Sequence, residues 1–280
     1  MTTRSRLSRS EAATDSAWRR WALFITILLT AAVSAVAVLF VTAAQLTSRA
    51  TAQHYLARAV DSLLEVDQFV ANAWPALQTA AEEGGPIALK GYPVSLQLEP
   101  GGLSEGPDAV ADAISATTAS LIYDDGFEVL AESRQVFRLV SRGGAFDGTI
   151  GRLTSGGHEV ATVALIVSGS FVILLALATA AQVRGLSRIG TPGFAIGLGA
   201  ALLWLAATLV RGSFEGRADA TADPFAADLW LIAADAGSLL VRNAAIVALA
   251  GGIVAASSIV GGGLLRVIET RGRRQPGAYA

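Results

Sequence analysis

The sequence predicts an all-α integral membrane protein with four transmembrane helices. Between the first and second helices it predicts a mainly helical extracytoplasmic domain that has room for one short strand or a small sheet. Three observations predict this class. Of the 280 residues, 52% are hydrophobic and only 16% are charged, against about 25% charged in a typical soluble domain. Four apolar runs are long enough to cross a bilayer, and arginines gather in the segments that four spans place on one side.

The first apolar run has 24 residues and no charge, and such a helix spans roughly 36 Å against a hydrocarbon core of about 30 Å. It exceeds the roughly 7–15 apolar residues of a cleaved signal peptide, which predicts an uncleaved signal anchor. Arg242 interrupts the start of the fourth run, and the sequence leaves open whether it lies within the membrane or at its edge. The predicted segments are a cytoplasmic tail (1–20), spans (21–44, 160–182, 193–210 and 239–265), an extracytoplasmic domain (45–159), a cytoplasmic turn (183–192), an extracytoplasmic loop (211–238) and a cytoplasmic tail (266–280).

The basic residues predict the orientation. The two tails and the turn between the second and third spans hold 11 basic and 3 acidic residues, whereas residues 45–159 and 211–242 hold 10 basic and 20 acidic ones. Because cytoplasmic loops carry an excess of Lys and Arg, both termini are predicted to lie in the cytoplasm, with the protein in the cell membrane. The 20 arginines against the single Lys90 suggest a GC-rich prokaryotic gene.

The extracytoplasmic domain is predicted to begin with a helix that continues from the first span to about Trp74, since no Pro or Gly occurs between Trp21 and Trp74. One stripe of this helix is apolar except at Asp67. Pro75 is expected to kink or end the helix, and Gly84-Gly85-Pro86 to end it. The stripe consists of Leu56, Val60, Leu63, Asp67, Val70, Trp74 and Leu77.

The rest of the domain shows shorter elements. Alternation over residues 94–98 predicts one strand, and residues 100–102 a turn. Ser104 is expected to cap a helix over residues 107–123, which Asp124-Asp125-Gly126 breaks, and a further helical piece is expected over residues 127–140. In the loop after the third span, Asp223-Pro224 predicts the start of an amphipathic helix that leads into the fourth span.

No catalytic, cofactor-binding or metal-ligating residue is assigned. Gly102-Leu103-Ser104-Glu105-Gly106 fits the nucleophile pattern G-x-S-x-G, but a hydrolase sheet is missing and the downstream His158 lies at the predicted membrane edge. A turn with a serine cap explains the same residues. Asp124, Asp125 and Glu128 lack the regular spacing of a calcium loop and are interpreted as a solvated helix end. Glu82 and Glu83 are interpreted in the same way.

The two histidines and the polar residues of the spans do not indicate a catalytic or transport site either. His54 and His158 lie near predicted membrane edges, where each is either a solvated side chain or a pH sensor. The first three spans contain no ionisable residue, which argues against a channel or pump. Small residues instead predict close helix packing, in one row at Gly193, Gly197 and Ala201 and in another at Gly252 and Ala256.

These observations favour a non-enzymatic binding or accessory subunit that acts through the extracytoplasmic domain. A membrane sensor that needs a separate output partner is the alternative, and a transporter or channel is the third reading. The expected partners are the lipid bilayer and either a membrane protein or a second copy of the chain. Zero cysteines and a net charge of −2 argue against thiolate metal sites and nucleic acid, and no cofactor is expected. The ligand, the oligomeric state and the biological process are not encoded in any recognisable pattern.

Overall fold

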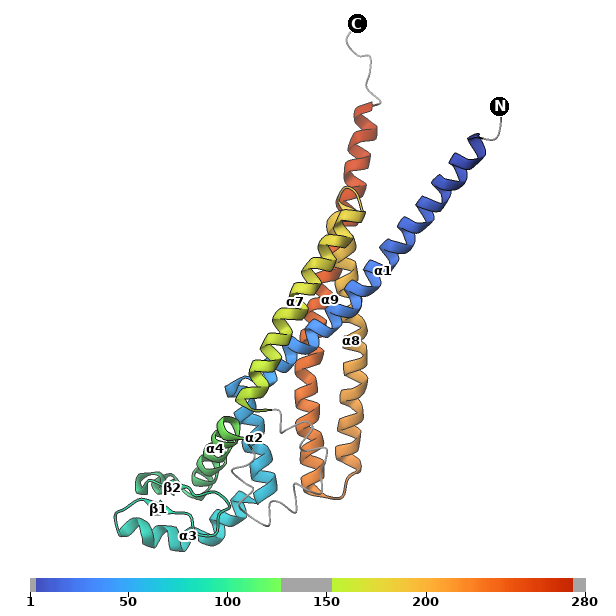
Figure 1. Ribbon diagram of the computed structural model, residues 1–280. Helices are drawn as coiled ribbons and strands as arrows, with labels where there is room; N and C mark the ends of the chain where they lie inside the picture. Colours follow the sequence, from blue (N-terminus) through green and yellow to red (C-terminus); the bar gives the residue numbers. More distant parts are fainter. Residues whose placement is uncertain (1–3, 127–152, 274–280) are drawn as a thin grey trace. The chain divides into compact units, whose positions relative to one another are not determined.

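A computed structural model describes residues 4–126 and 153–273, and it is mostly helical (Figure 1). Four helices are long and apolar enough to cross a membrane, at Trp18–Leu46, Ser155–Gln182, Ser187–Ala220 and Phe225–Leu264. The predicted fold class is therefore confirmed, and by the length and composition of these helices the chain is a multi-pass membrane protein. The elements are α1 (Arg4–Leu46), α2 (Arg49–Leu64), α3 (Val66–Glu82), β1 (Ile87–Ala88), β2 (Gln97–Leu98), the 3₁₀ helix η1 (Pro100–Glu105), α4 (Pro107–Asp125), α7 (Ser155–Gln182), α8 (Ser187–Ala220) and α9 (Pro224–Arg273).

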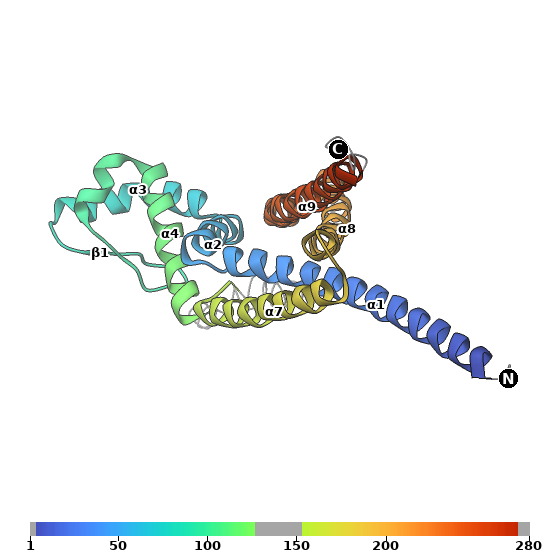
Figure 2. The same cartoon turned by 90° about the horizontal axis from the view of Figure 1, so that it is seen from above.

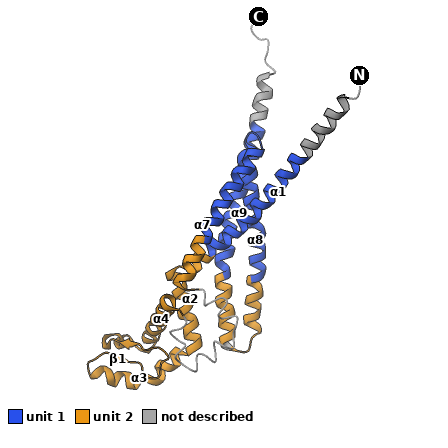
Figure 3. Cartoon of the chain, in the orientation of Figure 1, with its two compact units in different colours: residues 1–42, 164–210, 237–280 blue, residues 43–163, 211–236 orange. Residues whose placement is uncertain are grey.

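The chain divides into two compact units (Figure 3). Unit 1 comprises residues 1–42, 164–210 and 237–280, which hold the apolar parts of the four long helices. Unit 2 comprises residues 43–163 and 211–236, which hold α2 to α4, the small sheet and the adjoining ends of the long helices.

In unit 1, α1 makes a side-chain hydrogen bond to each of the other three long helices. The Thr30 hydroxyl lies 3.3 Å from that of Thr179 on α7, and Ser34 Oγ donates to the carbonyl of Ile196 on α8 at 3.1 Å. Asn243 Nδ2 on α9 donates to Thr42 Oγ1 at 3.0 Å. Because lipid offers no competing partners for polar groups, such bonds help to hold helices together.

Glycines set the closest approaches in unit 1, where α8 and α9 run side by side (Figures 1 and 2). The backbone of Gly251 on α9 contacts Gly193 and Gly197 on α8. A Cβ at Gly199 would clash with the backbone carbonyl of Ala31 on α1. The prediction for Gly193 and Gly197 is thus confirmed, since both are buried.

The other small-residue positions were predicted wrongly. Ala201, Gly252 and Ala256 are exposed, and nothing lies within 4 Å of a Cβ built at Gly252. On α9 the packed positions are Gly251 and Ala255, one residue before the predicted pair. Neighbouring residues on a helix point about 100° apart, so a shift of one position selects a different face.

Unit 2 is built around its own hydrophobic core, to which α2, α3, α4 and the segment around the two short strands all contribute. Leu56, Val66, Ile114 and Ile122 are completely buried. The strands pair antiparallel, with Ile87 opposite Leu98 and Ala88 opposite Gln97. β2, at Gln97–Leu98, is therefore shorter than the strand predicted over residues 94–98.

The predicted continuous helix from the first span to Trp74 is wrong, because the chain breaks twice. The first break follows Leu46, where Ser48 is extended with φ −61° and ψ 142°. The Thr47 and Ser48 hydroxyls donate back to the carbonyls of Ala43 and Gln45, and this local bonding competes with helix continuation. The second break is at Glu65, which is left-handed with φ 47° and ψ 49°.

The end of α3 follows the sequence signals in part. Pro75 lies inside α3 and does not end it, and the helix runs on to Glu82. Gly84, with φ 76°, then donates its N–H to the carbonyl of Ala81, so the predicted stop at residues 84–86 is confirmed. Every apolar member of the predicted stripe is at least partly buried, and Asp67 is exposed.

The boundaries of α4 and α9 were largely readable from the sequence. α4 begins at Pro107 and ends at Asp125, where Gly126 has φ 82°. Ser104 does not cap it, since its hydroxyl donates to the carbonyl of Gly101 within η1. α9 begins at Pro224 as predicted, but α8 extends to Ala220, so most of the predicted loop over residues 211–238 is helical. The helical piece predicted over residues 127–140 lies outside the described residues.

Candidate functional site

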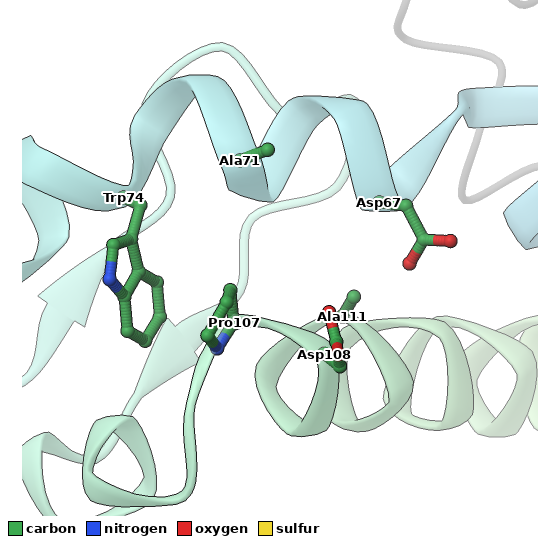
Figure 4. Close-up of a pocket in the computed structure, with 6 residues that line it drawn as sticks. All are labelled: Asp67, Ala71, Trp74, Pro107, Asp108 and Ala111. Carbon is green, nitrogen blue, oxygen red and sulfur yellow. The ribbon is translucent and has the colours of Figure 1, made fainter.

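A pocket of about 250 Å³ lies in unit 2, between α3 and the start of α4 (Figure 4). α3 contributes one wall and the first turn of α4 contributes the other. The lining residues are Asp67, Ala71, Trp74, Pro107, Asp108 and Ala111.

The spacing of residues on α3 produces one wall of this pocket. Asp67, Ala71 and Trp74 are separated by four and three residues, so they lie on one helix face. Ala71 in the middle is small, which leaves space between the indole and the carboxylate. Figure 4 shows the side chains of Trp74 and Asp67 both directed toward α4.

The start of α4 produces the facing wall. Gly106 has φ 101°, a conformation that L side chains rarely adopt, and the chain turns there into the helix. Pro107 and Asp108 then occupy the first turn, where an acidic side chain is favourable. Ala111 follows one turn later and is buried at 3% exposure, whereas Asp108 remains exposed.

The charge around the pocket is negative. Asp67 and Asp108 take part in none of the ion pairs that the structure shows between described residues. Nearby on α2, burial raises the pKa of the Asp61 carboxyl, and the charges of Asp67, Asp112 and Asp228 raise it further, while a backbone hydrogen bond from Asp67 lowers it. A carboxyl resists ionisation in this way where other negative charges lie close to it.

Two further features belong to the α3 wall. Within the described part of the chain, the ring of Trp74 makes no stacking or cation–π contact, unlike Trp230, which has Arg217 over its face at 5.0 Å. Pro75 has no N–H, so the carbonyl of Ala71 lacks the donor that residue 75 would otherwise supply in the helix. The lining therefore offers the indole ring of Trp74 for a stacking or cation–π contact, and the Ala71 carbonyl and the carboxylates of Asp67 and Asp108 as hydrogen-bond acceptors.

A second polar cluster lies where α1 ends, also in unit 2. The hydroxyl of Tyr123 on α4 donates to the Thr47 carbonyl at 3.1 Å. Thr47 Oγ1 donates to the carbonyl of Ala43 at 2.8 Å and lies 3.2 Å from Nδ1 of His158 on α7. The tautomer of His158 decides which of these two atoms donates in the contact. Thr47 thus joins the ends of α1 and α4 to the start of α7.

The candidates from the sequence do not come together in the structure. Ser104 lies in η1, and its backbone lacks the strain of a nucleophile elbow, because Glu65 is the only described non-glycine residue with positive φ. His158 contacts Thr47, and His54 is exposed with its ring 5.6 Å from that of Tyr55. No protein family, curated protein or solved structure matches this chain.

The acidic candidates are likewise scattered. Asp124 pairs with Arg49 at 2.7 Å, Glu82 and Glu83 are exposed at the end of α3, and Glu128 lies outside the described residues. In residues 4–126 and 153–273, no three His, Cys, Asp or Glu side chains are grouped in a way that could hold a metal ion.

One feature of the sequence indicates the α3 wall of the pocket, although no binding residue was predicted there. Asp67 is the one polar member of an otherwise apolar stripe, and Trp74 lies two turns further along the same face. The partner wall, Pro107 and Asp108, was assigned only as a helix start. What the sequence did not reveal is that α3 and α4 bring these two pairs together.

Proposed function

We propose that this multi-pass membrane protein is a non-enzymatic binding or accessory subunit, and that its binding surface is unit 2 on the extracytoplasmic side. The observation that carries the proposal is that the segment between the first two spans has its own hydrophobic core and a pocket with an aromatic wall. Binding sites are commonly concave and mostly apolar, with a few placed polar groups. The gathering of arginines in the two tails and in the turn between the second and third spans supports the orientation.

The proposal that the chain is not an enzyme is supported by the lining of the pocket. Its described lining residues include two carboxylates and an indole, but no serine, threonine, lysine or histidine that could supply a hydroxyl or amine nucleophile or an imidazole base. A fluorophosphonate probe should leave Ser104 unlabelled. Labelling that disappears in Ser104→Ala would contradict this part of the proposal.

A sensor that works through a separate output partner is the second candidate. The contact of Thr47 with Tyr123 and His158 favours it, because a displacement of α4 would act directly on the ends of α1 and α7. Transport has less support. Among the described residues, the buried polar side chains of unit 1 are hydroxyls and one amide, with no ionisable group.

Reporter fusions test the orientation on which the proposal depends. Fusions at Gly101 in η1 and at Ala222 between α8 and α9 should report an extracytoplasmic position, and a fusion at Ser187 at the start of α8 a cytoplasmic one. An inverted pattern at Gly101 and Ser187 would place the binding surface in the cytoplasm and overturn the proposal.

Site-specific photo-crosslinking in the native membrane tests the binding role. A photoreactive residue at Gln78 or Thr117, both exposed in unit 2, should give a discrete adduct with one protein or with a second copy of the chain. The same residue at Ile253, which is 66% exposed on α9, serves as the lipid-facing control. Substrate-dependent flux through the purified chain in liposomes, without any adduct, would favour transport.

A further inference from the structure

The carboxylates of the pocket create a site that repels anions and attracts cations. Asp67 lies on one wall and Asp108 on the other, and neither carboxylate takes part in an ion pair between described residues. A metal ion is a poor occupant, because calcium takes six to eight oxygen ligands and magnesium needs near-octahedral geometry. The described carboxylates form no such group.

The other lining residues select the kind of cation. Among aromatic side chains, tryptophan attracts a cation over its ring face most strongly, so Trp74 favours a cationic ligand. The attraction acts within about 6 Å of the ring centroid and becomes stronger where water is excluded. Ala71, Pro107 and Ala111 supply apolar surface beside it. A volume of about 250 Å³ is below the roughly 300–1,000 Å³ of sites for drug-sized ligands. It suits a single small group.

We propose that the pocket between α3 and α4 binds an organic cation, namely an ammonium or guanidinium group carried on a short apolar stem. The stem packs on Ala71 and Ala111, the cationic head lies against the indole of Trp74, and Asp67 and Asp108 supply the opposite charge. This proposal names the ligand class of the binding function proposed above and rests on it. Two sources share this chemistry, a free small amine and the Arg or Lys side chain of a partner protein.

Titration calorimetry on the full chain tests the proposal. The protein is kept in an uncharged maltoside detergent, because a choline-headed detergent would itself supply a quaternary ammonium. The probes are n-butylammonium, n-butanol and butyrate, which share the stem and differ in charge. n-Butylammonium should bind at least about tenfold more tightly than the other two, and added salt should weaken it. Equal binding of all three probes, or none by the cation, overturns the proposal.

Matched variants locate the binding. Asp67→Asn/Asp108→Asn should weaken n-butylammonium about tenfold or more, whereas Asp125→Asn/Asp219→Asn, which changes the net charge equally at exposed positions outside the pocket, should leave it within about twofold. Trp74→Phe should weaken it less than Trp74→Leu, since both keep apolar volume but only Phe keeps a ring. All four exposed carboxylates can be changed without opening the core, which circular dichroism verifies. Equal effects of the two double variants overturn the proposal.

Short peptides separate the two sources. Acetyl-Gly-Arg-Gly-amide that binds at least about tenfold more tightly than n-butylammonium assigns the pocket to a basic side chain, and the reverse order assigns it to a free amine. The same peptide with norleucine in place of Arg must lose binding, and its retention overturns the proposal. Failure here leaves the crosslinking and topology results unchanged, so a wrong ligand class and a wrong binding function can be told apart.

Discussion

A Cβ atom placed on Gly251 would lie 2.6 Å from the Cα of Gly197, so α9 and α8 meet backbone to backbone at this pair. Real Cβ contacts essentially never come so close. Neither backbone can yield as the end of a flexible side chain would. The close approach therefore depends on glycine at position 251, in the manner of other small-residue helix contacts in membranes. A Cβ at Gly197 would lie 3.2 Å from the backbone of Gly251, which is tight but less severe.

Gly251→Ala is expected to separate α8 from α9 and lower the stability of the protein. Overpacking of a tight contact costs about 1–3 kcal/mol. Gly252→Ala is the matched control, because nothing lies within 4 Å of its added methyl and alanine is the better helix former by about 1 kcal/mol. Thermal unfolding in maltoside should show a lower midpoint for the first variant and an equal or higher one for the second. A common shift for both variants would contradict the packing.

The hydrogen bond from Asn243 to Thr42 predicts a coupling energy between α1 and α9. In a double-mutant cycle of Asn243→Leu and Thr42→Val, the coupling should lie near 0.6 kcal/mol and not exceed about 1.7 kcal/mol. Thr208 is exposed and bonds the carbonyl of Trp204 on its own helix, so the cycle with Thr208→Val should show almost no coupling. Reversible unfolding in mixed micelles measures both cycles. Similar coupling in the two would mean that the interhelical bond contributes nothing specific.

The left-handed backbone at Glu65 predicts opposite effects for two substitutions. Glu65→Gly removes a strain of about 1–2 kcal/mol but adds freedom to the unfolded chain, so a gain of about 0.5–1 kcal/mol is expected. Glu65→Val, with a branched Cβ, should destabilise the join between α2 and α3. Thermal unfolding compares them. If the helix instead ran straight through residue 65, the Glu65→Val variant would be more stable than the Glu65→Gly variant, which would contradict the left-handed backbone at this position.

The raised pKa of Asp61 predicts a pH dependence of stability. Because the folded chain holds the Asp61 proton more tightly than the unfolded chain, this contribution is fully present below the unfolded value of about 3.9 and is lost as pH rises through the folded pKa. Asp61→Asn should therefore raise the unfolding midpoint at pH 7 and lose that advantage below about pH 4. In an Asp67→Asn background the gain should shrink, because the negative charge of Asp67, which helps to raise the pKa of Asp61, is gone. A gain that grows in acid would reverse the assignment.

Local patterns predicted those parts of the fold that depend on a few neighbouring residues. Pro107, Pro224 and Gly126 mark helix ends at the positions where the structure has them. Proline fits the first helical turn and glycine the left-handed residue after the last, whatever surrounds them. The absence of proline and glycine around Thr47 and Glu65 was a weaker guide, because absent breakers do not compel a helix to continue.

The candidate site shows the same division. The position of Asp67 and Trp74 on one helix face could be predicted from their spacing, because that depends only on the pitch of a helix. Their pairing with Asp108 could not, since it requires α3 to lie against α4, about 40 residues along the chain. The burial of Val66, Val70 and Ile114 in one core holds the two helices together.

The sequence by itself determined that this is a mostly helical, multi-pass membrane protein. Each span is a property of one continuous apolar run, and the thickness of the bilayer sets the length that such a run needs. Only the tertiary structure decided where the first helix breaks, that Gly251 rather than Gly252 faces α8, and that a pocket opens between α3 and α4. These features depend on which surfaces pack together. Packing joins residues that are distant in the chain, and its free energy overrides local preference.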